Sequence, residues 1–158
     1  YLIQPYESNE VFKILQDNFP DIPVKISVES QISQIRPSLK ILVADDNIIN
    51  QRVIRAIFKH LGYEISIAVN GAEALKMTKE NNFDILFMDL LMPEMDGCTA
   101  TQEIRKFNTT LPVIALSAAD DQSYINDALK AGMNEFLAKP VKLEAVKQLL
   151  IKLFSESL

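Results

Sequence analysis

The sequence predicts an α/β fold in which helices cover both faces of a five-stranded parallel sheet. From Leu39 onward, five short apolar segments typical of buried strands alternate with five segments whose apolar residues recur at helical spacing. Glycine, asparagine and proline lie at the junctions between these segments, where turns and helix ends are expected. Strands that alternate with helices form parallel sheets buried on both faces, which agrees with the apolar character of these strands.

Each expected element is bounded by such a signal. The expected strands cover residues 40–44, 64–69, 84–88, 111–116 and 135–137. The expected helices cover residues 48–61, 72–81, 98–107, 121–131 and 143–154. Gly62 and Gly132 follow two of the helices as C-terminal signals, and Asn70-Gly71 turns the chain after the second strand. Right-handed crossovers then place the carboxyl ends of all strands at one edge of the sheet.

The composition is that of a globular protein without a basic character. The chain has 158 residues, and its 16 basic and 21 acidic side chains give a net charge of −5. No nucleic-acid binding is therefore expected from this segment. Cys98 is the only cysteine, which excludes an internal disulfide and favours a reducing compartment, the cytoplasm. No apolar run reaches the roughly 20 residues that span a bilayer, so no membrane contact is expected here, while a membrane-anchored parent protein is left open.

Polar side chains with complementary chemistry lie where the apolar strands end. They are Asp45 and Asp46 after the first strand, Asp89 after the third, Ser117 after the fourth and Lys139 after the fifth. Three neighbouring carboxylates repel one another, and a hard cation such as Mg²⁺ relieves that repulsion. A lysine and a hydroxyl beside them would hold a phosphoryl group while a carboxylate attacks its phosphorus. A single aspartate after a strand is more often a helix cap, but five such groups at one sheet edge favour the functional interpretation.

Four segments resemble the motifs of receiver domains, the phosphorylated domains of two-component response regulators and hybrid sensor histidine kinases. They are residues 43–50 (VADDNIIN), 89–97 (DLLMPEMDG), 115–118 (ALSA) and 136–140 (FLAKP). The resemblance covers about Leu39 to Leu158, and the first motif is most similar to the receivers of hybrid kinases. It implies a flavodoxin-like, doubly wound sheet with strand order 2-1-3-4-5.

The resemblance also implies the chemistry of the site. Asp89 would accept a phosphoryl group from the phosphohistidine of a histidine kinase or a histidine phosphotransfer domain. Mg²⁺ would be bound by the side chains of Asp46 and Asp89, by the backbone carbonyl of Leu91 and, through water, by Asp45. Lys139 would pair with the phosphoryl oxygens.

Two further residues would form the switch that this resemblance implies. Ser117 would move to the phosphate, and Phe136 would turn inward behind it. The Lys139–Pro140 peptide bond is expected to be cis, because the lysine of the family is aimed by such a turn.

The residues before Leu39 are expected to lie outside this domain. Residues 1–19 match residues 136–154 at an offset of 135 (136 − 1), with five identities in nineteen positions. This predicts that residues 1–19 are the helical tail of a preceding receiver-like repeat, and an unrelated amphipathic helix is the alternative. Residues 20–38 contain three prolines and are expected to be a linker. The apolar side of the helix is expected to dock on a receiver surface, so a homodimer is a further expectation.

The expected function is that of a phosphorelay receiver that switches the interactions of a partner. The domain would catalyse its own phosphorylation, and the parent protein is expected to be a hybrid histidine kinase. A standalone or transcription-linked response regulator is the alternative. An aspartyl-nucleophile phosphatase of the haloacid dehalogenase type is disfavoured, because that chemistry needs a second aspartate two residues after the nucleophile, where this chain has Leu91.

Overall fold

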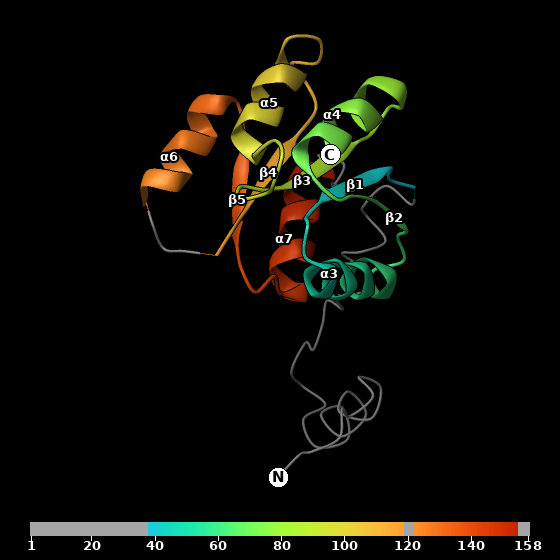
Figure 1. The fold of residues 1–158 in the computed structure, drawn as a ribbon. Coiled ribbons are helices and arrows are strands. Elements are labelled where there is room, and N and C mark those ends of the chain that lie inside the picture. Colours follow the sequence, from blue (N-terminus) through green and yellow to red (C-terminus); the bar gives the residue numbers. More distant parts are fainter. Residues whose placement is uncertain (1–37, 119–121, 155–158) are drawn as a thin grey trace, which may run out of the picture.

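The chain folds into three layers, with a sheet between two groups of helices (Figure 1). The structure, a computed structural model, describes residues 38–118 and 122–154. The helix expected within residues 1–19 and nearly all of the linker expected at residues 20–38 lie outside the described residues. The division of that part of the chain therefore stays a prediction.

The sheet is parallel throughout, and its strand order is β2-β1-β3-β4-β5. Its strands are β1 (Ile41–Ala44), β2 (Ile65–Ala68), β3 (Ile85–Asp89), β4 (Val113–Ser117) and β5 (Glu135–Ala138). The expected fold class and strand order are confirmed. Most strand ends differ from the expected bounds by one residue, and the fourth strand differs most, since it begins after Pro112, which has no backbone N–H for the ladder, and extends to Ser117.

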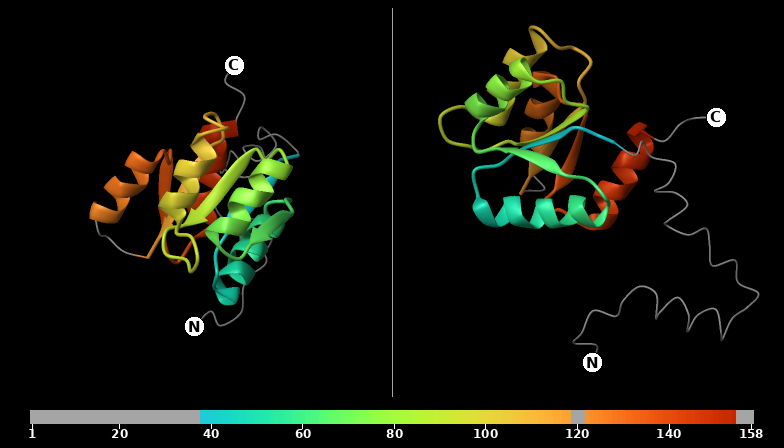
Figure 2. Two further views of the ribbon diagram at one scale, coloured as in Figure 1. Left: turned by 45° about the horizontal axis from the view of Figure 1, so that its top comes forward. Right: turned by 90° about the vertical axis from the view of Figure 1, so that its right-hand side faces the viewer.

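The helices lie in two groups, one on each face of the sheet. They are α3 (Ile48–His60), α4 (Gly71–Glu80), α5 (Gly97–Arg105), α6 (Gln122–Ala131) and α7 (Leu143–Phe154). Helices α3 and α7 cover one face, and α4, α5 and α6 cover the other (Figure 2). No helix in the described part of the chain is both long and apolar enough to cross a membrane.

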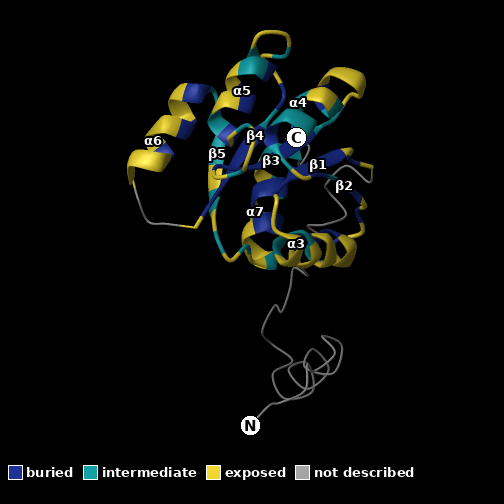
Figure 3. Ribbon diagram, viewed as in Figure 1, coloured by how far each residue is buried: buried dark blue, intermediate teal, exposed yellow. Residues whose placement is uncertain are grey.

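Alternate residues of the central strands supply two separate cores. On β1, Ile41 and Val43 pack with α3 and α7, whereas Leu42 and Ala44 pack with the opposite group of helices. Figure 3 shows how the buried residues concentrate in the sheet and on the inner sides of the helices. Burying one large apolar side chain contributes about 1.5–3 kcal/mol, so two filled faces hold the sheet rigidly between the helix layers.

Polar side chains cap the N-termini of the helices that follow the first three strands. Asn47 accepts hydrogen bonds from backbone N–H groups of α3, Asn70 accepts one from α4, and Asp96 accepts one from α5. Each cap satisfies an N–H group that the helix itself cannot pair, and caps of this kind are worth about 1 kcal/mol. Because parallel strands share one carboxyl edge, these anchored loops lie at the same edge as the expected site residues.

Candidate functional site

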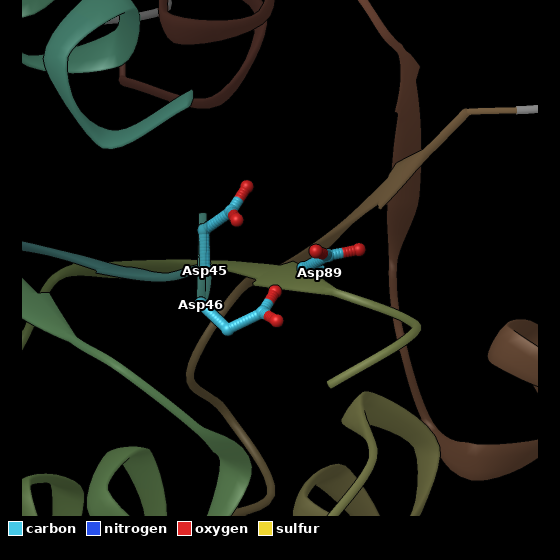
Figure 4. Close-up of side chains that lie close together, drawn as sticks. All are labelled: Asp45, Asp46 and Asp89. Atoms are coloured by element: carbon cyan, nitrogen blue, oxygen red, sulfur yellow. The ribbon is translucent and has the colours of Figure 1, made fainter. Parts of the chain in front are cut away.

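Three carboxylates meet at the carboxyl edge of the sheet. Asp45 directly follows β1, Asp46 comes next, and Asp89 is the last residue of β3. One oxygen from each side chain lies within 4.8 Å of the others, so the group could hold a metal ion (Figure 4). Strands β1 and β3 are neighbours in the sheet, so residues far apart in the chain are brought together by the strand order.

Lys139 is the cation that faces these carboxylates. Its Nζ lies 2.9 Å from Oδ2 of Asp89 and 3.4 Å from Oδ2 of Asp45. The Lys139 side chain is only 16% exposed, so both ion pairs are shielded from water. The backbone N–H of Lys139 donates to the carbonyl of Ser117 (2.7 Å), and the Lys139–Pro140 peptide bond is cis, as expected.

Burial dominates the electrostatics of Asp89. Its side chain is buried, and this desolvation raises the pKa of Asp89 above the usual range for an aspartate. The hydrogen bond and the positive charge of Lys139 lower the pKa, while the negative charge of Asp45 raises it again. The lysine therefore compensates only part of the cost of holding this carboxylate out of water.

One oxygen of Asp45 is anchored, and the other accepts no hydrogen bond. Oδ1 accepts from the backbone N–H of Asn47 (2.9 Å) and from Nδ2 of Asn50 (3.5 Å). Oδ2 is buried and has no hydrogen-bond partner within the described residues, since its contact with Lys139 at 3.4 Å is an ion pair without hydrogen-bond geometry. A buried carboxylate oxygen without a hydrogen bond lowers the stability of the fold. A hard cation, which prefers oxygen ligands, would stabilise it. The donor set therefore fits Mg²⁺.

Two of the three carboxylates, those of Asp46 and Asp89, line a hollow of about 260 Å³, which we call the acidic hollow. Its polar lining comes from Asp46, Asp89, Ser117, Lys139 and Asn50, and its apolar lining includes Leu91 and Tyr124. The structure thus brings together the carboxylates, the hydroxyl and the lysine that the sequence analysis selected. Asp46 is exposed, which leaves one carboxylate accessible from solvent.

The loop that carries Leu91 is held against the start of α4. The backbone N–H of Gly71 donates to the carbonyl of Met95, and Nδ2 of Asn70 donates to Oε2 of Glu94, both at 3.1 Å. A Cβ atom at Gly71 would lie 2.3 Å from the carbonyl oxygen of Met95, so this approach requires glycine. Leu91 also donates its backbone N–H to Oδ1 of Asp89 (3.3 Å). These contacts fix the backbone beside the acidic hollow.

The remaining expected residue, Phe136, is 46% exposed on β5, and its inward turn stays a prediction. The sequence analysis assigned no role to Asn50, Gln51 or Tyr124. Helical spacing could have indicated the first two, because residues 47, 50 and 51 lie on one side of the first turn of a helix. For Tyr124 the sequence carries no comparable signal.

Comparison with known proteins identifies the family of this chain. Residues 41–151 match the family model of the response regulator receiver domain. Hybrid signal transduction histidine kinase A of Dictyostelium discoideum is 40% identical over 119 residues, which cover 72% of this chain and 6% of that kinase. The chain belongs to the receiver domain family, and it spans a small part of this curated relative.

Two solved structures resemble the fold closely. The receiver domain of sensor histidine kinase PA1611 from Pseudomonas aeruginosa, with a magnesium ion in its active-site cleft, gives a TM-score of 0.69 at 36% identity, covering 73% of this chain and 97% of that one. The receiver domain of the Saccharomyces cerevisiae response regulator Ssk1, solved with the histidine phosphotransfer protein Ypd1, gives a TM-score of 0.70 at 29% identity, covering 75% and 90%.

The raised pKa of Asp89 predicts that this residue lowers stability. The pKa of Asp89 is higher in the folded chain than in the unfolded chain, so the fold is favoured when Asp89 is protonated. The free energy of unfolding is therefore higher at low pH, and it falls as the pH rises through the folded-state pKa of Asp89. Asp89→Asn removes the charge, so without Mg²⁺ this variant is expected to unfold at a higher urea concentration than the unaltered chain at neutral pH. The difference should shrink as the pH falls through the folded-state pKa.

Glu80→Gln is the matched control, because Glu80 is an exposed carboxylate at the C-terminal end of α4. A surface substitution of this kind should change the free energy of unfolding by less than about 0.5 kcal/mol. A lower urea midpoint for Asp89→Asn than for the unaltered chain at neutral pH would contradict the electrostatic description of the site.

Proposed function

We propose that Asp89 is the phosphoryl acceptor of this receiver domain and that a phosphohistidine is the donor. The observation that supports this most directly is the cluster of three carboxylates within 4.8 Å, with Lys139 2.9 Å from Asp89 and a buried oxygen of Asp45 without a hydrogen bond. A buried carboxylate oxygen without a hydrogen bond, close to two further carboxylates, lowers the stability of the fold, which favours a functional over a purely structural role.

The metal in this proposal is Mg²⁺, as in the related receiver that was solved with magnesium. The side chains of Asp46 and Asp89 and the backbone carbonyl of Leu91 would hold the ion directly, and Asp45 would hold it through water. When bound, the ion would neutralise the negative charge that builds up between the carboxylates and the incoming phosphoryl group.

The side chains of the acidic hollow would then carry the transfer. A carboxylate oxygen of Asp89 attacks the phosphorus, the bond from phosphorus to the donor imidazole nitrogen breaks, and the imidazole leaves with that electron pair. Lys139 can change partners, because its Nζ already lies beside Oδ2 of Asp89 and a phosphoryl oxygen would occupy similar space. The hydroxyl of Ser117 would bind another phosphoryl oxygen, and Phe136 would turn inward behind it.

The exposed apolar residues at the start of α3 are the proposed docking surface for the donor. Ile48, Ile49 and Val53 are 61%, 67% and 45% exposed, and they lie next to Asn47 and Asn50 at the rim of the acidic hollow. The donor class is a histidine kinase or a histidine phosphotransfer protein, such as the one bound to the related yeast receiver. Contiguous apolar side chains at a surface mark interaction sites of this kind.

The parent protein in this proposal is a hybrid histidine kinase. It is either located in the cytoplasm or anchored in a membrane with its receiver domain on the cytoplasmic side. The support is the similarity to a hybrid histidine kinase. The matched residues form 6% of that kinase. A standalone or transcription-linked response regulator is the second candidate, and the related receiver of Ssk1 belongs to a response regulator.

Chemical phosphorylation tests the proposed acceptor. With Mg²⁺ and acetyl phosphate, the chain should gain one phosphoryl group that hydroxylamine removes, as expected for an acyl phosphate. Asp89→Asn and chelation of Mg²⁺ should each abolish labelling, whereas Asp127→Asn, an exposed aspartate on α6, should leave it intact. Undiminished labelling of Asp89→Asn, or labelling that persists without Mg²⁺, would overturn the assignment of the acceptor.

Transfer from a protein donor tests the docking surface separately. Ile49→Asp places a charge among apolar contacts, so phosphotransfer from phosphorylated Ypd1 should slow by about tenfold or more, as for a central interface residue. Labelling by acetyl phosphate should be unchanged, because the small donor needs no docking surface. Leu129→Asp, at an exposed apolar residue on α6, is the matched control. Equal transfer rates for Ile49→Asp and the unaltered chain would show that α3 is not the docking surface.

A further inference from the structure

In the first turn of α3, apolar side chains are exposed and polar side chains face inward, which is the reverse of the usual pattern. Ile48 and Ile49 are 61% and 67% exposed, whereas the amides Asn50 and Gln51 are half-buried. About one and two turns further along, the same helix buries Ile54 and Phe58 in the ordinary way. Local rules are broken in this manner mainly at functional sites, so the two amides need a reason for facing inward.

Both amides contact Asp45. Nε2 of Gln51 donates to the backbone carbonyl of Asp45 at 2.6 Å, and Nδ2 of Asn50 reaches Oδ1 of Asp45 at 3.5 Å. The Gln51 contact is the stronger of the two, because 3.5 Å is at the limit of a useful hydrogen bond. Asp45 lies just beyond β1, and its N–H still donates to the carbonyl of Ala68 on β2 (3.0 Å). Gln51 thus satisfies a buried carbonyl at the point where the strand ends.

The backbone at this point decides whether Asp45 and Asp46 can serve one ion. Consecutive side chains of an extended strand point to opposite faces of the sheet. Asp45 is fully buried and Asp46 is exposed, yet an oxygen of each lies within 4.8 Å of the other and of Asp89 (Figure 4). Asp45 is the first residue after β1, and the chain bends at Asp46, directly beyond the carbonyl that Gln51 holds.

We propose that Gln51 is a positioning residue of the metal site, which fixes the Asp45 carbonyl so that the carboxylates of Asp45 and Asp46 both face Asp89. This inference rests on the proposed function, since it assigns Gln51 a role in binding the Mg²⁺ of that function. Gln51 acts through the backbone and contacts neither the ion nor the phosphoryl group. Asn50 supports the same arrangement from the carboxylate of Asp45.

The test is a Mg²⁺ titration of the 158-residue chain, followed by the amide NMR signals of residues 45, 46 and 89. Gln51→Met keeps the length of the side chain but cannot donate a hydrogen bond. Its affinity for Mg²⁺ should fall by about tenfold, which is the typical effect of removing a group that orients a metal ligand. Gln51→Arg, which restores a donor on a long side chain, should recover most of the affinity. Gln148→Leu, which removes an exposed amide bound to Glu144 on α7, should leave the affinity unchanged.

A purely structural role would give a different result. In that case Gln51→Met would lower the urea midpoint without Mg²⁺ but bind Mg²⁺ as tightly as the unaltered chain, and the proposal would be wrong. In the unaltered chain, the side-chain amide protons of Gln51 provide a second measurement that needs no variant. One of them should exchange slowly with solvent and shift when Mg²⁺ is added, and fast exchange with no shift would also overturn the proposal.

The outcomes separate this inference from the proposed function. If the unaltered chain binds no Mg²⁺ and is not labelled at Asp89, the proposed function fails. If the unaltered chain binds Mg²⁺ and Gln51→Met binds it equally well, the proposed function stands and the role of Gln51 is refuted.

Discussion

The repulsion among three carboxylates at one sheet edge is the constraint on which the rest of the site depends. Asp45, Asp46 and Asp89 lie within 4.8 Å of one another, and Lys139 offsets only part of the cost, because the pKa of Asp89 stays above its usual range. In a parallel sheet buried on both faces, the strands cannot move apart to relieve this repulsion. The repulsion is therefore retained, and a cation bound among the carboxylates would relieve it.

Separate hydrogen bonds hold Asp45, Lys139 and the loop after β3 in place. The backbone N–H of Asn47 and the amide of Gln51 hold Asp45, and the backbone N–H of Lys139 donates to the carbonyl of Ser117. The loop after β3 is fixed by its contact with α4. Most of these contacts are polar and lie at the edge of the sheet, although Met95 of that loop also packs against one core, so the cores support the charged groups from below. This arrangement explains how one fold can present an accessible, charged site without losing its stability.

The sequence predicted the platform and the charged groups, because both depend on local pattern. Apolar runs and turn residues identify the strands, and the carboxyl ends of parallel strands necessarily share an edge, so Asp45, Asp89 and Lys139 could be grouped before their distances were known. The orientation of Gln51 could not be predicted, because an amide in a helical pattern is as compatible with solvent as with a backbone carbonyl. The end of β4 was placed one residue early, because a serine after apolar residues resembles a helix cap. The exposure of Phe136 was not predicted, because it depends on the place of β5 at the edge of the sheet.

A crystal structure of the chain with Mg²⁺ and beryllium fluoride, a mimic of the phosphoryl group, tests the central claim most directly. The mimic is expected to bind the carboxylate of Asp89, with Lys139 and Ser117 on its fluorine atoms. The ion is expected to contact the side chains of Asp46 and Asp89 and the backbone carbonyl of Leu91. A mimic bound at another residue, or an ion bound away from the three carboxylates while Lys139 stays on Asp89, would contradict the central claim.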